Sequence, residues 1–407
     1  MTRLAEILSQ GDEIVTGAVV DTNAAWLARL LEEAGLRVRR HMAVGDDPEA
    51  IAAALRGASE RAGHVVCTGG LGPTDDDHTA LGVSLAFDLP LEERAEALQQ
   101  VEARYAAFGR ALDPSGRRQA RLPRGAVLLE NRFGTAPGFR LDRSGCTLWF
   151  LPGVPREMEG MAREHLEPAL VSLGLVRDRI HVVRCVGIGE SLVQERLRDL
   201  ALPPGIRIGW RAMIPEVQVR LRGRPEVPPE VLSAVVDRVT LALGDHVFGV
   251  DSGPLEEVIG LRLRDLGQTV ATAESCTAGR LAAALTRVPG ASAWFLEGAV
   301  VYANAAKARS CGVDLEVLAA HGAVSEPVAR AMAEGIRARA GSTWGLSTTG
   351  IAGPTGGTPE KPVGTVYIAV AGPSGTTQRR LRLTGAREPI MDRTVGAVLD
   401  LLRGVLG

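Results

Sequence analysis

Residues 64–77 read HVVCTGGLGPTDDD, an apolar run that passes directly into a glycine-rich and acidic segment. The run His64–Thr68 has the length and residue types of a buried strand, and it follows a helical pattern over Pro48–Ala62 that ends at Gly63. Such alternation of strands and helices indicates an α/β domain with a mostly parallel sheet. Ligands of these sheets bind where the strands end, so we expect residues 69–77 to line a binding crevice.

The alternation continues on both sides of this segment. Strands are expected at Leu4–Ser9 and Leu36–Val44, and a helix between them is capped by Asp21 and Thr22. From about residue 177 the apolar runs become shorter, which favours a small α+β module, and α/β alternation resumes after a linker at 251–254. We therefore expect three domains, which span residues 1–172, 173–250 and 255–407.

Composition restricts the classes of function. Apolar residues make up 45% of the chain and charged residues 23%, as in folded globular proteins. The formal net charge of −2 gives no general attraction to nucleic acids or anionic membranes. No apolar run approaches the roughly 18 residues of a membrane span, and no signal peptide is recognisable. We expect a cytoplasmic protein with no membrane or nucleic-acid partner. The five scattered cysteines indicate neither a disulfide framework nor a zinc site.

The glycines of residues 69–72 and the acidic residues after them combine two kinds of chemistry. Glycines let backbone N–H groups approach a phosphate, and the carboxylate of Asp77 could hold Mg²⁺ beside it. Glu13 and Asp46 follow the two neighbouring strands and should reach the same crevice. Metal-assisted attack on a pyrophosphate is one use of such a site. The alternative is that these acidic residues only cap helices.

A second group of polar residues lies at 270–281, which read VATAESCTAGRL. A strand, a turn of small residues and a helix are expected, with Ser275 at the helix N-terminus, where N–H groups suit a phosphate or an oxyanion. An ordinary helix cap is the simpler alternative. Cys276 is a rival nucleophile, because a helix N-terminus lowers the pKa of a thiol.

Tyr302 and Lys307 lie five residues apart, and Lys307 is one of only two lysines among 46 basic residues. A desolvated lysine can lose its proton and act as a base, whereas arginine cannot. Codon bias with two remaining lysines is the alternative. The loop at 347–357, STTGIAGPTGG, offers hydroxyls and N–H groups that could hold ribose or phosphate. Arg387 could contact a phosphate.

These motifs resemble the C-terminal domain of the CinA family, a nicotinamide mononucleotide deamidase. The similar segments are AESCT at 273–277, Tyr302 with Lys307, AVS at 323–325, TGIAGP at 349–354 and PEKPVGT at 359–365. The resemblance implies that Ser275 is the nucleophile, that Tyr302 and Lys307 assist it, and that no cofactor is needed. It also implies substrate contacts from Cys276, Thr277, Gly279, Asn304, Thr349, Gly350 and Arg387. Ala278 departs from the family's usual glycine.

The N-terminal segment resembles the molybdopterin-binding fold of MoaB and MogA proteins, in the version that CinA carries. There it is associated with ADP-ribose pyrophosphatase activity that depends on a divalent metal. The resemblance implies a three-layer domain in which Asp46 and Asp77 are catalytic and bind Mg²⁺ or a similar ion. Its implied substrate contacts are Glu13, Asn23, Gly69, Gly70, Gly72 and Thr74. The middle module resembles the KH-type domain of CinA, but Gly187-Ile188-Gly189-Glu190 is not a GXXG motif.

The sequence therefore predicts a bifunctional hydrolase, whose substrates are nicotinamide mononucleotide and ADP-ribose. The family resemblance also suggests a homodimer. One alternative is a protein that binds or adenylylates molybdopterin and carries an accessory C-terminal domain. Another is a non-catalytic scaffold linked to DNA uptake or damage, which the near-neutral charge disfavours.

Overall fold

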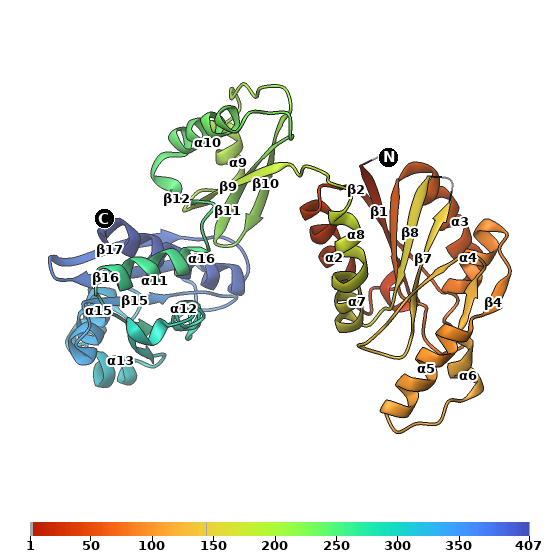
Figure 1. Ribbon diagram of the computed structural model, residues 1–407. Coiled ribbons are helices and arrows are strands. Elements are labelled where there is room, and N and C mark those ends of the chain that lie inside the picture. The colour runs from red at the N-terminus through yellow and green to blue at the C-terminus, as the bar shows by residue number, and fades with distance from the viewer. Residues whose placement is uncertain (1–2, 144, 407) are drawn as a thin grey trace. The chain divides into compact units, whose positions relative to one another are not determined.

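The computed structural model describes residues 3–143 and 145–406. The chain forms two compact units, residues 1–178 and residues 179–407. Figure 1 shows the first unit in red to yellow and the second in green to blue.

The first unit is built on a six-stranded sheet in the order β2-β1-β3-β8-β7-β6. The first four strands of that order are parallel, β7 is antiparallel to β8, and β6 is antiparallel to β7. The strands are β1 (Leu4–Gln10), β2 (Arg37–Val44), β3 (His64–Thr68), β6 (Val127–Leu129), β7 (Gly138–Arg143) and β8 (Cys146–Leu151). A separate antiparallel pair joins β4 (Leu91–Glu93) to β5 (Arg121–Pro123).

Helices cover both faces of this sheet, which gives three layers (Figure 1). Ile7 of β1 packs in one apolar cluster with Leu27, and the adjacent Leu8 packs in another with Leu55, because successive strand residues face opposite sides. The helices are α1 (Asp12–Val15), α2 (Thr22–Glu33), α3 (Pro48–Arg61), α4 (Thr79–Phe87), α5 (Ala95–Ala107), α6 (Pro114–Arg118), α7 (Pro155–Met161) and α8 (Glu167–Val171).

The helix cap predicted at Asp21 and the predicted strand ends are present in this unit. The side chain of Asp21 accepts a hydrogen bond from Ala24 N at 2.9 Å and so caps α2. The parallel strands β1, β2 and β3 end at Gln10, Val44 and Thr68. Their following loops therefore lie along one edge of the sheet, where α/β domains bind ligands.

The second unit begins with a four-stranded antiparallel sheet in the order β10-β11-β9-β12. Its strands are β9 (Arg179–Val186), β10 (Ile206–Met213), β11 (Glu216–Gly223) and β12 (Val247–Val250). Two helices, α9 (Glu190–Arg196) and α10 (Pro229–Leu243), pack on it through one apolar cluster. After α9 the chain continues in tighter turns, in which Arg198 N and Leu200 N each donate to the carbonyl oxygen three residues before.

A five-stranded sheet in the order β14-β13-β15-β16-β17 completes the second unit. β13 (Val270–Glu274) is parallel to β14 (Phe295–Val300) and to β15 (Trp344–Gly350). β16 (Thr365–Gly372) pairs antiparallel with β15, and β17 (Gly375–Arg382) pairs antiparallel with β16. The helices are α11 (Leu255–Asp265), α12 (Arg280–Thr286), α13 (Asn304–Cys311), α14 (Leu315–His321), α15 (Glu326–Ala340) and α16 (Arg387–Leu406).

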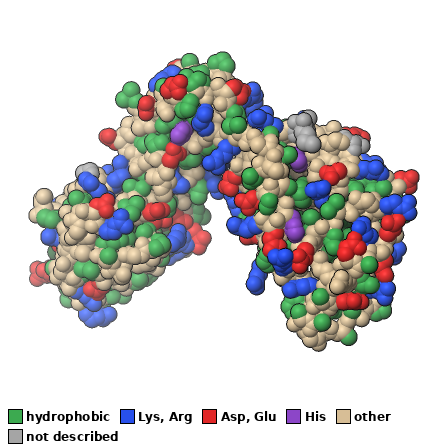
Figure 2. Space-filling model, in the orientation of Figure 1, with side chains coloured by type: hydrophobic (Ala, Val, Ile, Leu, Met, Phe, Trp, Pro, Cys, Tyr) green, Lys and Arg blue, Asp and Glu red, His purple; other side chains and the backbone are tan. Residues whose placement is uncertain are grey.

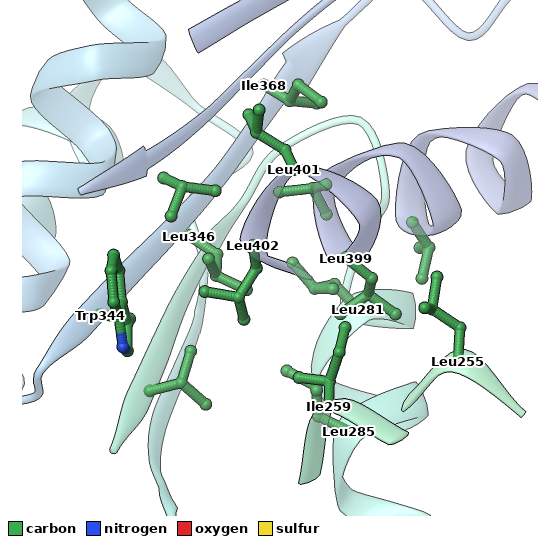
Figure 3. Packing of buried hydrophobic residues seen from close by; sticks show 14 of the residues in the cluster. Leu255, Ile259, Leu281, Leu285, Trp344, Leu346, Ile368, Leu399, Leu401 and Leu402 are labelled. Atoms are coloured by element: carbon green, nitrogen blue, oxygen red, sulfur yellow. The ribbon is translucent and has the colours of Figure 1, made fainter. Parts of the chain in front are cut away.

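Apolar clusters occupy both faces of this second sheet. Figure 3 shows the cluster that joins Leu281 of α12 and Leu399 of α16 to Leu346 of β15. On the other face, Ala273 of β13 packs in a cluster with Met332 of α15. The residue after β13 is thus held between two packed layers.

The outer surface carries acidic and basic side chains intermixed on the face shown in Figure 2. This agrees with a formal net charge of only −2. In the part of the chain that the structure describes, no helix is both long and apolar enough to cross a membrane.

Burial of His64 in β3 predicts that acid destabilises the first unit. The side chain is buried, and burial lowers its pKa below the usual 6.5 because the charged imidazolium is desolvated. The unfolded chain therefore binds this proton more tightly, and the stability that neutral His64 contributes is lost as pH falls below about 6.5. We expect the melting temperature to fall between pH 7.5 and pH 5.5, and to fall less steeply in His64→Gln.

Calorimetric melting curves across this pH range test the expectation. His41→Gln is the matched control, since His41 lies exposed on β2. An equally steep fall in wild type and His64→Gln would show that His64 does not cause the acid sensitivity.

Candidate active site

The end of β13 brings Ser275 into contact with Lys307 of α13. Lys307 Nζ lies 3.1 Å from Ser275 Oγ, although the two residues are 32 positions apart. Lys307 is 1% exposed and Ser275 is 9% exposed, so both are largely shielded from water. A hydroxyl and an amine thus share one buried hydrogen bond.

Lys307 Nζ has two further partners, the carbonyl oxygens of Val301 at 2.9 Å and Tyr302 at 3.1 Å. Burial lowers the pKa of Lys307, because the ammonium form loses its hydration. None of its hydrogen-bond partners among the described residues is a carboxylate. A neutral amine has two N–H donors and one lone pair. If the carbonyls take both donors, the lone pair faces the Ser275 hydroxyl.

Backbone contacts fix the position of Ser275 between two neighbouring strands. Ser275 N donates to Thr348 O of β15 at 2.9 Å. On the other side, Val301 N, just after β14, donates to Glu274 O at 2.7 Å, while Val301 O accepts from Lys307. Val301 therefore connects β13, which leads to Ser275, to the amine of Lys307.

The expected helix N-terminus at Ser275 is wrong in detail. α12 begins only at Arg280, after a turn over residues 275–279. Ala278 and Gly279 have φ angles of 51° and 94°, which are left-handed and cannot continue a right-handed helix. The predicted contact residue Gly279 supplies this conformation at little cost, whereas Ala278 adopts it despite its Cβ.

Glu274 occupies the place that an external anion was expected to take. Its buried carboxylate accepts hydrogen bonds from Leu281 N at 3.0 Å and Ala282 N at 2.8 Å in the first turn of α12. The Thr277 hydroxyl donates to it as well, at 2.7 Å. The N-terminus of α12 is therefore neutralised from within the protein. No sequence motif indicates this role of Glu274, because its partners are mostly backbone groups, which every residue has.

Cys276 is poorly suited to be the nucleophile. It is 4% exposed, and burial raises the pKa of its thiol to about 12. The thiolate is the reactive form, so a thiol with this pKa is almost entirely protonated near neutral pH. The geometry favours Ser275 over Cys276.

Tyr302 and Arg387 form an exposed rim beside the buried pair. The Tyr302 side chain is 58% exposed, and its hydroxyl accepts from Arg387 Nη2 at 3.1 Å. Arg387 also donates to Gly353 O at 2.7 Å. Lys307 contacts the carbonyl of Tyr302 and not its hydroxyl. The structure thus brings Tyr302 to the site, with its hydroxyl bonded to arginine.

The remaining predicted contacts of the C-terminal domain are divided between the interior and the surface. The Thr277 hydroxyl is fully buried and shares a 2.6 Å hydrogen bond with Thr348 Oγ1. Thr349 Oγ1 donates to Ala323 O at 2.7 Å, and Gly350 ends β15 beside it. Asn304 opens α13 and is exposed.

Lys361 fastens the loop that carries Ala323. Its Nζ donates to His321 O at 3.1 Å and to Val324 O at 2.8 Å. Lys361 and Thr349 therefore hold the same loop against the end of β15. Both lysines of the chain point their amines at backbone carbonyl groups.

In the first unit, the glycine-rich loop lines a cavity of about 290 Å³. Gly70, Gly72, Thr74 and Asp77 all contribute to its wall, and so does Phe139. Gly69 lies so close to Gln10 that a Cβ there would come within 2.3 Å of a carbonyl oxygen. Close backbone packing therefore requires glycine at position 69, next to the two glycines of the cavity wall.

The predicted carboxylates are already engaged with their own loops. Asp77 Oδ2 accepts from Thr74 N at 2.8 Å and from the Thr74 hydroxyl. Asp46 Oδ2 accepts from Asp12 N at 3.1 Å. Burial raises the pKa of Asp46, and the nearby carboxylates of Asp12, Asp76 and Glu13 raise it further.

Asn23 joins two loops of the same edge. Its amide donates to Gly153 O at 2.7 Å and to Thr68 Oγ1 at 3.1 Å. Across residues 3–143 and 145–406, no three His, Cys, Asp or Glu side chains form a group that could hold a metal ion.

Three family models match the chain in succession. They are described as a probable molybdopterin binding domain over residues 6–172, a damage-inducible protein CinA KH domain over residues 181–249 and a CinA C-terminal domain over residues 252–406. A CinA-like protein of Anaeromyxobacter sp. (strain Fw109-5) is 47% identical over 406 residues, which cover 98% of each chain. The chain belongs to the CinA family.

One further relative and two solved structures are also similar to this chain. A CinA-like protein of Citrifermentans bemidjiense is 43% identical over 404 residues, covering 98% of this chain and 97% of the relative. The crystal structure of CinA from Thermoplasma acidophilum is 36% identical and covers 42% of this chain and 98% of its own, with a TM-score of 0.40. The crystal structure of a competence/damage inducible protein from Agrobacterium tumefaciens is 38% identical. It covers 38% of this chain and 98% of its own, with a TM-score of 0.37.

CinA membership confirms the family and the fold class predicted from sequence. The chain is a mixed α/β protein with a molybdopterin-binding-like N-terminal domain, a CinA KH domain and a CinA C-terminal domain.

All five cysteines of this CinA protein are free and buried, which predicts low thiol reactivity. We expect an aromatic disulfide reagent to label none of them rapidly in the native protein and all five after denaturation. Absorbance of the released thiolate measures the stoichiometry. One rapidly labelled thiol in the native protein that disappears in Cys276→Ser would restore Cys276 as a candidate nucleophile.

Proposed function

We propose that the C-terminal domain hydrolyses the carboxamide of nicotinamide mononucleotide to nicotinate mononucleotide and ammonia. The observation that carries the proposal is the 3.1 Å contact between Lys307 Nζ and Ser275 Oγ in a buried site. A serine hydroxyl is a weak nucleophile until a neighbouring base removes its proton, and a neutral lysine can be that base. The resemblance to CinA deamidase domains supplies the substrate.

The reaction proceeds by acyl transfer in two halves. Ser275 Oγ attacks the carboxamide carbon while its proton passes to Lys307 Nζ. The tetrahedral intermediate collapses when the new ammonium returns a proton to the leaving nitrogen, which departs as ammonia. Water then attacks the acyl ester, and Lys307 accepts the water proton and gives it back to Ser275 Oγ. The product is nicotinate mononucleotide.

The rim residues suit the rest of the nucleotide. Arg387 offers guanidinium donors for the phosphate, which bind phosphate oxygens in pairs. The exposed ring of Tyr302 offers an apolar face for the pyridine ring or ribose. In this arrangement the Arg387–Tyr302 hydrogen bond holds both side chains ready for substrate.

Ammonia release from nicotinamide mononucleotide tests the proposal. We expect no turnover in Ser275→Ala and a loss of about 10³-fold or more in Lys307→Arg, since arginine cannot accept a proton. Cys276→Ala should retain measurable turnover. kcat/KM should rise with pH as Lys307 loses its proton, with a midpoint below the usual 10.5 because burial lowers this pKa. Undiminished turnover in Ser275→Ala would remove the proposed nucleophile.

For the N-terminal domain we propose ADP-ribose pyrophosphatase activity that depends on a divalent metal. The cavity beside Gly70 and Gly72 supports this, because glycine N–H groups can approach phosphate oxygens. Mg²⁺ commonly binds one or two carboxylates together with substrate phosphates, so Asp77 in the cavity wall and Asp46 would be its protein ligands. Burial raises the pKa of Asp46 most, and the carboxylates of Asp12, Asp76 and Glu13 raise it further, a repulsion that a cation would relieve. When bound, a divalent ion would supply positive charge beside the pyrophosphate.

The alternative for this domain is binding or adenylylation of molybdopterin. The family model described as a probable molybdopterin binding domain favours it. The wall that Leu122 and Phe139 contribute to the cavity suits either a pterin or an adenine ring. Thermal shifts with ADP-ribose and with a pterin distinguish the two ligands.

ADP-ribose cleavage should require added Mg²⁺ and stop when a chelator is added. Asp77→Asn should lower the rate by about 10²-fold or more, because it removes one carboxylate from the ion. Asp88→Asn is the matched control, since Asp88 lies exposed at the C-terminus of α4. Cleavage that persists in chelator, or in Asp77→Asn at the wild-type rate, would refute the assignment.

A further inference from the structure

Glu274 precedes the proposed nucleophile and is almost completely buried, with 1% of its surface exposed. Its Oε2 accepts from Thr277 Oγ1 at 2.7 Å, Gly279 N at 3.0 Å and Leu281 N at 3.0 Å, and its Oε1 accepts from Ala282 N at 2.8 Å. All four donors belong to the eight residues that follow it. The Glu274 side chain is thus hydrogen-bonded both to the turn after β13 and to the start of α12.

This arrangement holds the turn in a conformation that the chain would not adopt unaided. Ala278 has a left-handed φ of 51°, which is unfavourable for a residue with a Cβ. The hydrogen bonds from Gly279 and Thr277 to Glu274 flank this residue on both sides. Because the carboxylate lies at the positive end of α12, the helix dipole strengthens them.

Two N–H groups of the turn have no hydrogen-bond partner in another described residue. Ser275 N donates to Thr348 O, and Ala278 N donates to Ser275 O at 3.2 Å. The N–H of Thr277 has no such partner, and the N–H of Cys276 contacts only the sulfur of its own side chain, although these residues are 0% and 4% exposed. A buried N–H group without a partner is costly. Two such N–H groups next to a nucleophile suggest a ligand atom that accepts a hydrogen bond from each.

We propose that Glu274 is a positioning residue which keeps the Cys276 and Thr277 N–H groups directed at the substrate's carbonyl oxygen. During attack by Ser275 that oxygen becomes an oxyanion, and two N–H donors stabilise it most when they are fixed in advance. The inference rests on the proposed amide hydrolysis at Ser275. It adds that the carboxylate binds the helix end so that the amides of the turn remain available to substrate.

The test compares Glu274→Gln with wild type on nicotinamide mononucleotide and on its thioamide analogue. Glutamine has one acceptor oxygen, so one carboxylate position becomes an NH₂ group that faces N–H donors. We expect kcat to fall about 10- to 100-fold while KM changes less than about threefold. The reason is that misplaced N–H donors weaken the stabilisation of the oxyanion in the transition state and not the binding of the substrate. Sulfur accepts hydrogen bonds weakly, so the wild-type preference for the oxygen substrate should narrow in the variant.

Glu297→Gln is the matched control, because Glu297 is paired with Arg339 at 2.9 Å on β14 of the same domain. It should leave kcat and the oxygen-to-sulfur preference unchanged. Melting curves accompany each variant, and Glu274→Asp is measured in the same way if Glu274→Gln does not fold.

Two results would overturn the inference, and they are distinguishable. If wild type releases ammonia and the Glu274 variant loses activity with an unchanged oxygen-to-sulfur preference, Glu274 has only a structural role. If wild type releases no ammonia from nicotinamide mononucleotide, the proposed function fails first and the inference fails with it.

Discussion

The C-terminal site depends on an amine buried without a compensating carboxylate. A protein normally pairs a buried charge or avoids it, because removing an ion from water is costly. Lys307 instead contacts two carbonyl oxygens and one hydroxyl, all uncharged. This environment favours the neutral amine, which is the form that can accept a proton. The same burial that would penalise a structural lysine therefore makes Lys307 suitable as a base.

Both candidate sites lie at the ends of parallel strands, but their local charges differ. In the first unit, burial raises the pKa of Asp46, and the neighbouring carboxylates of Asp12, Asp76 and Glu13 raise it further. In the second unit, the single carboxylate of Glu274 is fully occupied by N–H and O–H donors. Similar strand-to-helix connections thus produce an acidic edge in one domain and a neutral, hydroxyl-bearing edge in the other.

Periodicity and capping residues were enough to predict most elements that carry the sites. The helix after Asp21 and the strand at His64–Thr68 have nearly the expected bounds, because both are fixed by local chemistry and by apolar spacing. Proximity of Ser275 to Lys307 was predicted from motifs. The start of α12 was not, since alanine rarely adopts the left-handed conformation that Ala278 has here.

Contacts between distant segments set the limit of prediction from sequence. The hydrogen bond between Arg387 and the Tyr302 hydroxyl joins residues 85 positions apart, and a lone arginine in an arginine-rich chain carries little information. Glu274 acts through backbone groups, which every residue possesses. Such roles become visible only when the donors and acceptors are counted in three dimensions.

Val301 contacts both residues through its backbone. Its N–H donates to the backbone carbonyl oxygen of Glu274, and its own carbonyl oxygen accepts from Lys307 Nζ. It directly follows β14, an edge strand that has a neighbour on one side only. A slip of one residue in this pairing would exchange the two faces of the strand and carry the amine away from the hydroxyl. Insertions or deletions in the segment between β13 and β14 are therefore tolerable only if they leave the alignment of this outermost strand intact, even though such margins of a sheet usually accept variation.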